Sequence, residues 1–135
     1  MPTETNLEYC PASGLVIFRD PKWQHCTIQE HYYVDFCFIG RRILLITHHG
    51  DTQYQDIRKF YRLREQFLAE SFTRFGSSGR VVEMRDYGDT FGMPSKETRV
   101  KQIQYLYENR HQILGLIIFN MSVKVRSIIR MGLSL

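Results

Sequence analysis

The chain has 135 residues, of which 43% are hydrophobic and 13% aromatic. This length fits one domain, and the aromatic content argues against intrinsic disorder. The formal net charge is +4 and the isoelectric point is near 9.1. However, residues 1–52 carry four basic and six acidic side chains, whereas residues 53–135 carry fourteen and eight. The basic character belongs to the second part alone, which weakens composition as evidence for nucleic acid binding.

Cysteine usage and hydropathy bear on the compartment. Cys10, Cys26 and Cys37 are odd in number and form no Cys-x-x-Cys pair, which is typical of reduced thiols in a cytosol. The first eight residues are polar and acidic, so we expect no signal peptide. The longest apolar run, Ile113–Phe119, is far shorter than the ~20 residues of a membrane helix and predicts a buried strand. We therefore expect a cytoplasmic domain that does not insert into a membrane.

Residues 1–30 are the least regular segment, with two short predicted strands at 7–10 and 15–19. An antiparallel hairpin then follows, because two runs rich in aromatic and β-branched residues, 32–39 and 43–48, flank the turn Gly40-Arg41-Arg42. The first run is largely apolar on both faces, as expected of a strand within a covered sheet. One face carries Tyr32, Val34, Phe36 and Phe38, and the other carries Tyr33, Asp35, Cys37 and Ile39.

After Gly50-Asp51-Thr52 breaks the strand pattern, apolar residues spaced by three and four predict a long helix that ends at Gly76–Gly79. These residues are Ile57, Phe60, Tyr61, Leu63, Phe67, Leu68, Phe72 and Phe75. A strand at 80–85 and a loop at 86–93 come next. Ser95 is the predicted N-cap of a helix with an apolar stripe of Val100, Ile103, Leu106 and Tyr107. A strand at 113–120 and a helix at 122–131 complete the pattern.

This order predicts one α/β domain over residues 1–135. From residue 43 strands and helices alternate as βαβαβα, which requires crossover connections and therefore parallel strand pairing. The hairpin around Arg41 adds antiparallel strands in front. We expect a mixed β-sheet with helices packed on it.

Several segments of this pattern resemble the STAS-like (anti-sigma factor antagonist-like) modules that precede PAS and histidine-kinase domains in bacterial sensor proteins. The resemblance runs from about residue 31 to the end of the chain. It rests on Ile39–Ile43, Gly50-Asp51 with the helix after it, Val81–Tyr87, Pro94–Arg99 and Gly115–Ser122.

The resemblance implies a non-catalytic signalling module without a cofactor. Such a module serves as the N-terminal input or docking domain of a sensor histidine kinase in a two-component system. Its partners would be another protein, its own kinase domains or a second copy in a homodimer. The alternative within the family is a free-standing antagonist switched by phosphorylation. Ser95 stands at the corresponding helix entry, although the Asp-Ser-Ser-Gly string of true antagonists is missing.

The segment from the predicted loop into the following helix is the candidate partner surface. Exposed aromatic residues in a loop favour contact with a protein, and Lys96 and Arg99 stand close enough to Ser95 to pair with an added phosphate. The candidate residues are Asp86, Tyr87, Asp89, Phe91, Ser95, Lys96 and Arg99.

Two other classes of function have weaker support. Acid–base chemistry would use Asp86, Asp89 and His48, but no nucleophile motif accompanies them. His48 and His49 are adjacent on a strand, point to opposite faces and do not predict a metal site, so we interpret them as polar residues at the end of a strand.

Nucleic acid binding is the remaining alternative. It would use the helix face of Arg58, Lys59, Arg62 and Arg64, for which a solvated face or a protein contact is the simpler interpretation. The last predicted helix adds Lys124, Arg126 and Arg130 without an acid. We expect it to pack on the sheet or on a second copy.

Overall fold

The computed structural model describes residues 7–76 and 79–120. The predicted helix at 122–131 therefore lies outside the described residues. The strands are β1 (Glu8–Tyr9), β2 (Val16–Phe18), β3 (Cys26–Gln29), β4 (Tyr32–Ile39), β5 (Ile43–Asp51), β6 (Val81–Phe91) and β7 (Ile113–Phe119). The helices are α1 (Ile57–Phe75) and α2 (Lys96–Glu108), with short 3₁₀ turns η2 (Pro21–Trp23), η3 (Thr52–Tyr54) and η4 (Arg110–Gln112).

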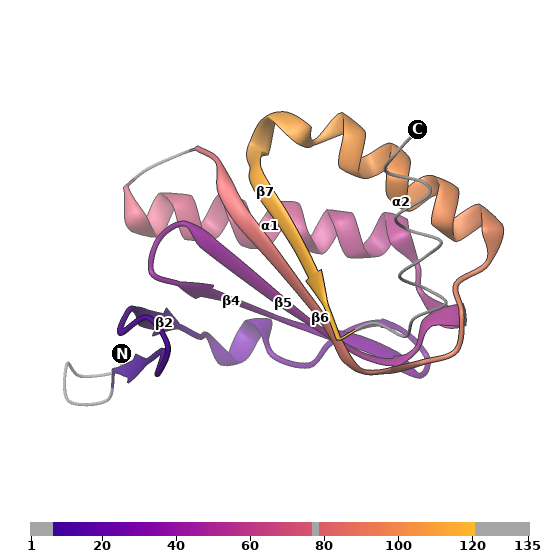
Figure 1. Cartoon of the computed structure of the whole chain (residues 1–135), viewed down its shortest axis with the longest axis horizontal. Coiled ribbons are helices and arrows are strands. Elements are labelled where there is room, and N and C mark those ends of the chain that lie inside the picture. The colour runs from indigo at the N-terminus through magenta and orange to yellow at the C-terminus, as the bar shows by residue number, and fades with distance from the viewer. Residues whose placement is uncertain (1–6, 77–78, 121–135) are drawn as a thin grey trace.

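The seven described strands form one mixed sheet in the order β1-β2-β4-β5-β6-β7, with β3 paired to β4. Strands β1 to β5 pair antiparallel, and β5–β6 and β6–β7 pair parallel. Figure 1 shows the strands crossing in front of α1, with α2 near β7. The α/β class and the mixed sheet are thus confirmed, as is the hairpin at Gly40, whose φ of 64° suits glycine.

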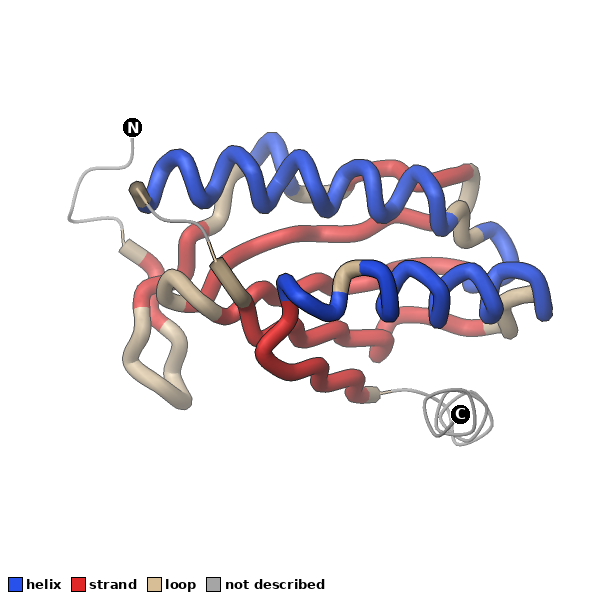
Figure 2. The backbone as a smooth tube through the Cα atoms, turned by 90° about the horizontal axis from the view of Figure 1, so that it is seen from above, coloured by secondary structure: helices blue, strands red, loops and turns tan. Residues whose placement is uncertain are grey.

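Both helices cover the same face of the sheet. Phe67 of α1 lies 5.3 Å from Phe36 of β4, measured between ring centroids, and Tyr61 stacks at 4.6 Å on Tyr105 of α2. Figure 2 shows α1 and α2 side by side. On this face Val34, Phe36 and Phe38 are fully buried. Tyr33, Asp35 and Ile39 on the other face are only half-buried, so the expectation of a strand covered on both faces holds fully for one face.

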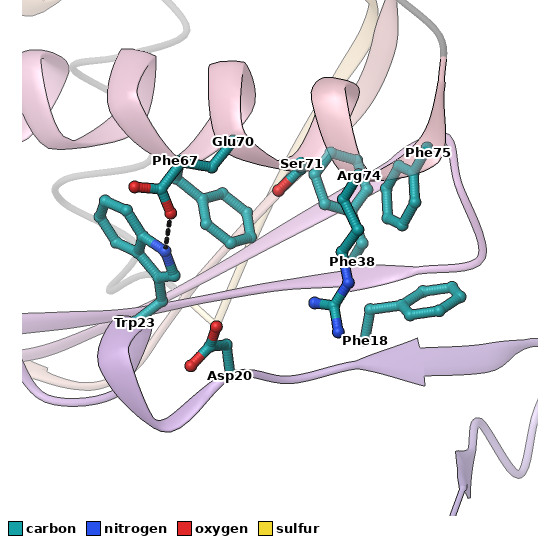
Figure 3. A pocket seen from close by; sticks show the side chains of 9 residues that line it. All are labelled: Phe18, Asp20, Trp23, Phe38, Phe67, Glu70, Ser71, Arg74 and Phe75. Carbon is teal, nitrogen blue, oxygen red and sulfur yellow. Dashed lines mark hydrogen bonds between the residues drawn. The ribbon is translucent and has the colours of Figure 1, made fainter. Parts of the chain in front are cut away.

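The irregular N-terminal segment packs against α1 through Trp23. Its indole is buried against Phe36 and Phe67 and donates a hydrogen bond of 2.9 Å to Glu70 of α1 (Figure 3). Asp20 caps the 3₁₀ turn that positions Trp23, because its carboxylate accepts from the backbone N–H of Lys22. A segment with little regular structure therefore closes one end of the core.

Two strands extend beyond their predicted ends. β5 continues through Gly50 to Asp51, although we predicted a break there. At Gly50, where φ is 106°, a Cβ atom would lie 2.0 Å from the carbonyl oxygen of His31, so only glycine allows the two strands to stay paired. β6 continues to Phe91, so the predicted loop at 86–93 is wrong for most of its length.

Candidate protein-interaction surface

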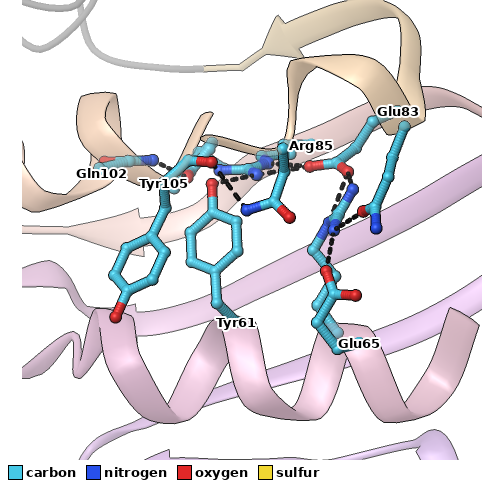
Figure 4. A network of polar contacts seen from close by, with 10 residues as sticks. Tyr61, Glu65, Glu83, Arg85, Gln102 and Tyr105 are labelled. Carbon is cyan, nitrogen blue, oxygen red and sulfur yellow. Dashed lines mark hydrogen bonds and ion pairs between the residues drawn. The ribbon is translucent and has the colours of Figure 1, made fainter. Parts of the chain in front are cut away.

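A buried ionic network joins α1 to β6 (Figure 4). Glu83 of β6 accepts from Arg64 of α1 at 2.7 Å and from Arg85 at 2.5 Å, and Arg85 also donates to the hydroxyl of Tyr61 at 2.9 Å. All three charged side chains are fully buried. The expectation of a solvated face is therefore wrong for Arg64, whereas Arg58 and Arg62 are exposed.

The charges of this network keep Glu83 ionised. Burial alone raises the pKa of its carboxyl, but Arg85 and Arg64 outweigh burial and hold the pKa below its ordinary value. Two guanidinium groups thus share one carboxylate inside the fold, and the network links α1 to β6. The signal in the sequence was the spacing: Arg64 falls on the apolar stripe of α1, and Glu83 and Arg85 alternate on one face of a strand.

The two adjacent histidines point to opposite faces of the sheet, as predicted, but β5 continues to Asp51, so they do not end the strand as we expected. His48 is fully buried on the helix-covered face, 2.5 Å from the hydroxyl of Tyr32 and stacked at 4.2 Å on Tyr87. Burial, with Arg85 nearby, lowers the pKa of His48 well below its ordinary value. His48 is therefore a neutral core residue.

His49 lies on the other face between two carboxylates. Its Nε2 is 2.7 Å from Asp35 and its Nδ1 is 2.6 Å from Asp89, and its ring stacks at 4.5 Å on Tyr33. Partial burial lowers the pKa of His49, but the hydrogen bonds to Asp89 and Asp35 outweigh burial and raise the pKa above its ordinary value. Because carboxylates only accept, both ring nitrogens donate when the imidazole is charged.

These positions bear on the catalytic and metal alternatives. His48 lies on the helix-covered face, whereas Asp89 bonds to His49 on the opposite face, so the three residues of the acid–base alternative do not converge. The carboxylate of Asp86 accepts hydrogen bonds from the backbone N–H of Gly88 and the side-chain amide of Asn120. Within residues 7–76 and 79–120, no group of three His, Cys, Asp or Glu side chains is arranged to hold a metal ion.

The structure separates the residues of the predicted partner surface. Tyr87 is buried, and its hydroxyl accepts from Gln102 of α2 at 3.2 Å, so the expectation of an exposed aromatic is wrong there. Phe91 is 65% exposed at the end of β6. Asp86 and Asp89 lie on β6, where Asp89 bonds to His49 and Asp86 accepts from Gly88 and Asn120.

The entry to α2 is built as predicted. Ser95 caps the helix, accepting from the backbone N–H of Thr98 at 3.1 Å, and remains exposed with Lys96. Arg99 donates to the backbone carbonyl of Pro94 at 2.8 Å. The cap is therefore confirmed, while phosphorylation of Ser95 stays a prediction.

The apolar stripe predicted for α2 is only partly buried. Leu106 is buried, as is Gln102, but Val100 and Tyr107 are 56% and 65% exposed. A helix that exposes two large apolar side chains seven residues apart presents them on one side, where a partner can cover them.

β7 is an edge strand, and this corrects the expectation of a buried one. It pairs with β6, and no other described strand pairs with its outer edge. Leu114 and Ile117 are 52% and 48% exposed. With no charged residue and no proline over 113–119, β7 lacks the devices that normally prevent edge pairing. We define the β7–α2 edge as the outer edge of β7, which carries the exposed Leu114 and Ile117, together with α2, which exposes Val100 and Tyr107. Ile117 is the register partner of Met84 and lies on the sheet face that the helices leave open.

Comparisons with known proteins add no identification. No family model matches this chain, and no curated protein or solved structure is significantly similar to it. In the part of the chain that the structure describes, neither helix is long and apolar enough to cross a membrane.

Proposed function

We propose that this chain is a non-catalytic, STAS-like signalling module that acts by self-association through the β7–α2 edge. The single observation that carries the proposal is β7, a seven-residue apolar strand whose outer edge pairs with no described strand. Unpaired N–H and C=O groups along such an edge are a template for a strand of another chain.

The occupant we favour is a second copy of this chain, with its β7 antiparallel to the first. Two apolar edges meet without charge repulsion, although the whole chain is basic. A two-fold arrangement pairs the same strand of both copies, so one edge serves both sides.

This mode of action agrees with the role that the resemblance implies. An input domain that pairs with its copy joins two kinase chains, and a signal that alters the pairing changes their association. Cytoplasmic location and the sensor-kinase context belong to this proposal. Nucleic acid binding receives less support, because one residue of the basic helix face, Arg64, is buried in an ion pair.

Ile117→Lys tests the edge. A lysine on an edge strand opposes pairing with another strand, so we expect the dissociation constant of the dimer to rise about tenfold or more. Analytical ultracentrifugation over a concentration series measures this change, and circular dichroism verifies folding.

Leu15→Lys is the matched control. Leu15 is 44% exposed next to β2, far from β7 in the strand order, so its replacement leaves association unchanged. If the unmodified chain stays monomeric at about 1 mM, where association is weaker than about −4 kcal/mol, self-association is rejected. Equal effects of the two lysines would reject β7 as the site.

A further inference from the structure

A cavity of about 270 Å³ lies between the C-terminal half of α1 and the N-terminal segment (Figure 3). Its volume is just below the range of about 300–1,000 Å³ that is usual for small-molecule sites. The aromatic lining residues are Phe18, Trp23, Phe38, Phe67 and Phe75, and the polar ones are Asp20, Glu70, Ser71 and Arg74.

The polar groups of the cavity are unequally engaged. Glu70 accepts from Lys22 at 2.7 Å and from the Trp23 indole at 2.9 Å, and these hydrogen bonds lower the pKa of its carboxyl. Asp20 caps the turn before Trp23. Both carboxylates therefore already have donors.

Arg74 differs from these two carboxylates. Among the interactions of the described residues, its guanidinium makes no ion pair and no hydrogen bond. Figure 3 shows its side chain extending from α1 toward β2, while Glu70 turns toward Trp23. The cavity therefore offers the partly exposed rings of Phe18 and Phe75 and, among the described residues, one cation without a partner, whose planar donors match a carboxylate.

We propose that this cavity binds a small carboxylic acid with an aromatic or apolar body. The body lies against Phe18 and Phe75, the partly exposed aromatic residues of the lining, and its carboxylate pairs with Arg74. Because the cavity joins α1 to the segment that holds Trp23, an occupant links the two. Such a site supplies the module with a chemical input that is separate from the β7–α2 edge.

Trp23 is the single tryptophan of the chain and reports on its own cavity. Titration with phenylacetate is expected to change its fluorescence saturably, with half-saturation near or below about 1 mM. Phenylacetamide has the same body without the charge and is expected to bind about tenfold more weakly or worse. Benzylamine, a cation, is expected not to bind.

Arg74→Gln removes the charge at an exposed position and is expected to weaken phenylacetate binding about tenfold while leaving the melting temperature unchanged. Arg62→Gln is the matched control, since Arg62 is an exposed arginine of α1 outside the cavity lining. Tighter binding of benzylamine than of phenylacetate would overturn the proposal. So would equal affinities of the Arg74→Gln and Arg62→Gln variants, or no response of Trp23 to phenylacetate. None of these outcomes bears on association through β7.

Discussion

At the scale of single residues, the two adjacent histidines carry opposite dependence on pH. His48 has a lowered pKa in the folded chain. Below about pH 6.5 its imidazole is therefore protonated in the unfolded chain but not in the folded chain, and the folded chain loses stability as the pH falls. His49 has a raised pKa, so its contribution is present below about pH 6.5 and is lost as the pH rises through the folded-state value. The combined contribution of His48 and His49 to the free energy of unfolding is therefore greatest near pH 6.5.

We therefore expect the free energy of unfolding to fall by up to about 1.4 kcal/mol per pH unit between pH 6.5 and 5.5, because of His48. Urea denaturation at a series of pH values measures this slope. His48→Phe removes the slope, whereas His31→Gln, at an exposed histidine, retains it. A free energy of unfolding that is constant from pH 6.5 to 5.5 would contradict a buried, neutral His48, and NMR of its ring reports the protonation state independently.

At the scale of elements, the buried ionic network joins α1 to β6. Replacing Glu83 leaves Arg64 and Arg85 buried without their shared carboxylate. Uncompensated charge of this kind costs about 3–5 kcal/mol, so Glu83→Gln is expected to lower the free energy of unfolding by that amount. Thermal or urea denaturation measures it.

Glu65→Gln is the matched control for this network. Glu65 bonds to the same Arg64 at 2.8 Å, but its side chain is 45% exposed and its ion pair is screened by solvent. We expect its replacement to cost less than about 1 kcal/mol. Similar losses in the two variants would mean that the buried position of Glu83 has no special role.

At the scale of the whole molecule, the apolar character of β7 makes salt a diagnostic of the partner. Association through Leu114 and Ile117 buries uncharged side chains, so raising the salt concentration from about 0.1 to 0.5 M is expected to leave the dimer constant nearly unchanged. Nucleic acid binding by the basic second part would instead weaken steeply with salt. Ultracentrifugation in the two buffers measures the first, and a steep loss of the dimer with salt would indicate charged contacts in place of the apolar edge.

The periodicity of apolar residues predicted helices and strands well in segments with few glycines and aspartates. The alternation in 32–39 correctly placed Phe36 and Phe38 on one face and Asp35 on the other, but it did not indicate which face the helices cover. The same reasoning failed at Gly50 and after Arg85, because glycines and aspartates there were interpreted as loop signals. In the structure Gly50 keeps the strand close to His31, and the polar residues of β6 have partners in neighbouring strands and helices.

The composition and hydrophobic pattern by themselves determined the α/β class, the parallel half of the sheet and the cap at Ser95, since these depend on residues close together in the chain. Only the tertiary structure decided which charged and polar residues are buried, because their partners lie far away in sequence. Glu83 is 19 residues from Arg64, and Glu70 is 47 residues from Trp23. It likewise decided that β7 lies at an edge and that Arg74 faces an aromatic cavity, since the order of strands and the packing of segments are not written in local spacing.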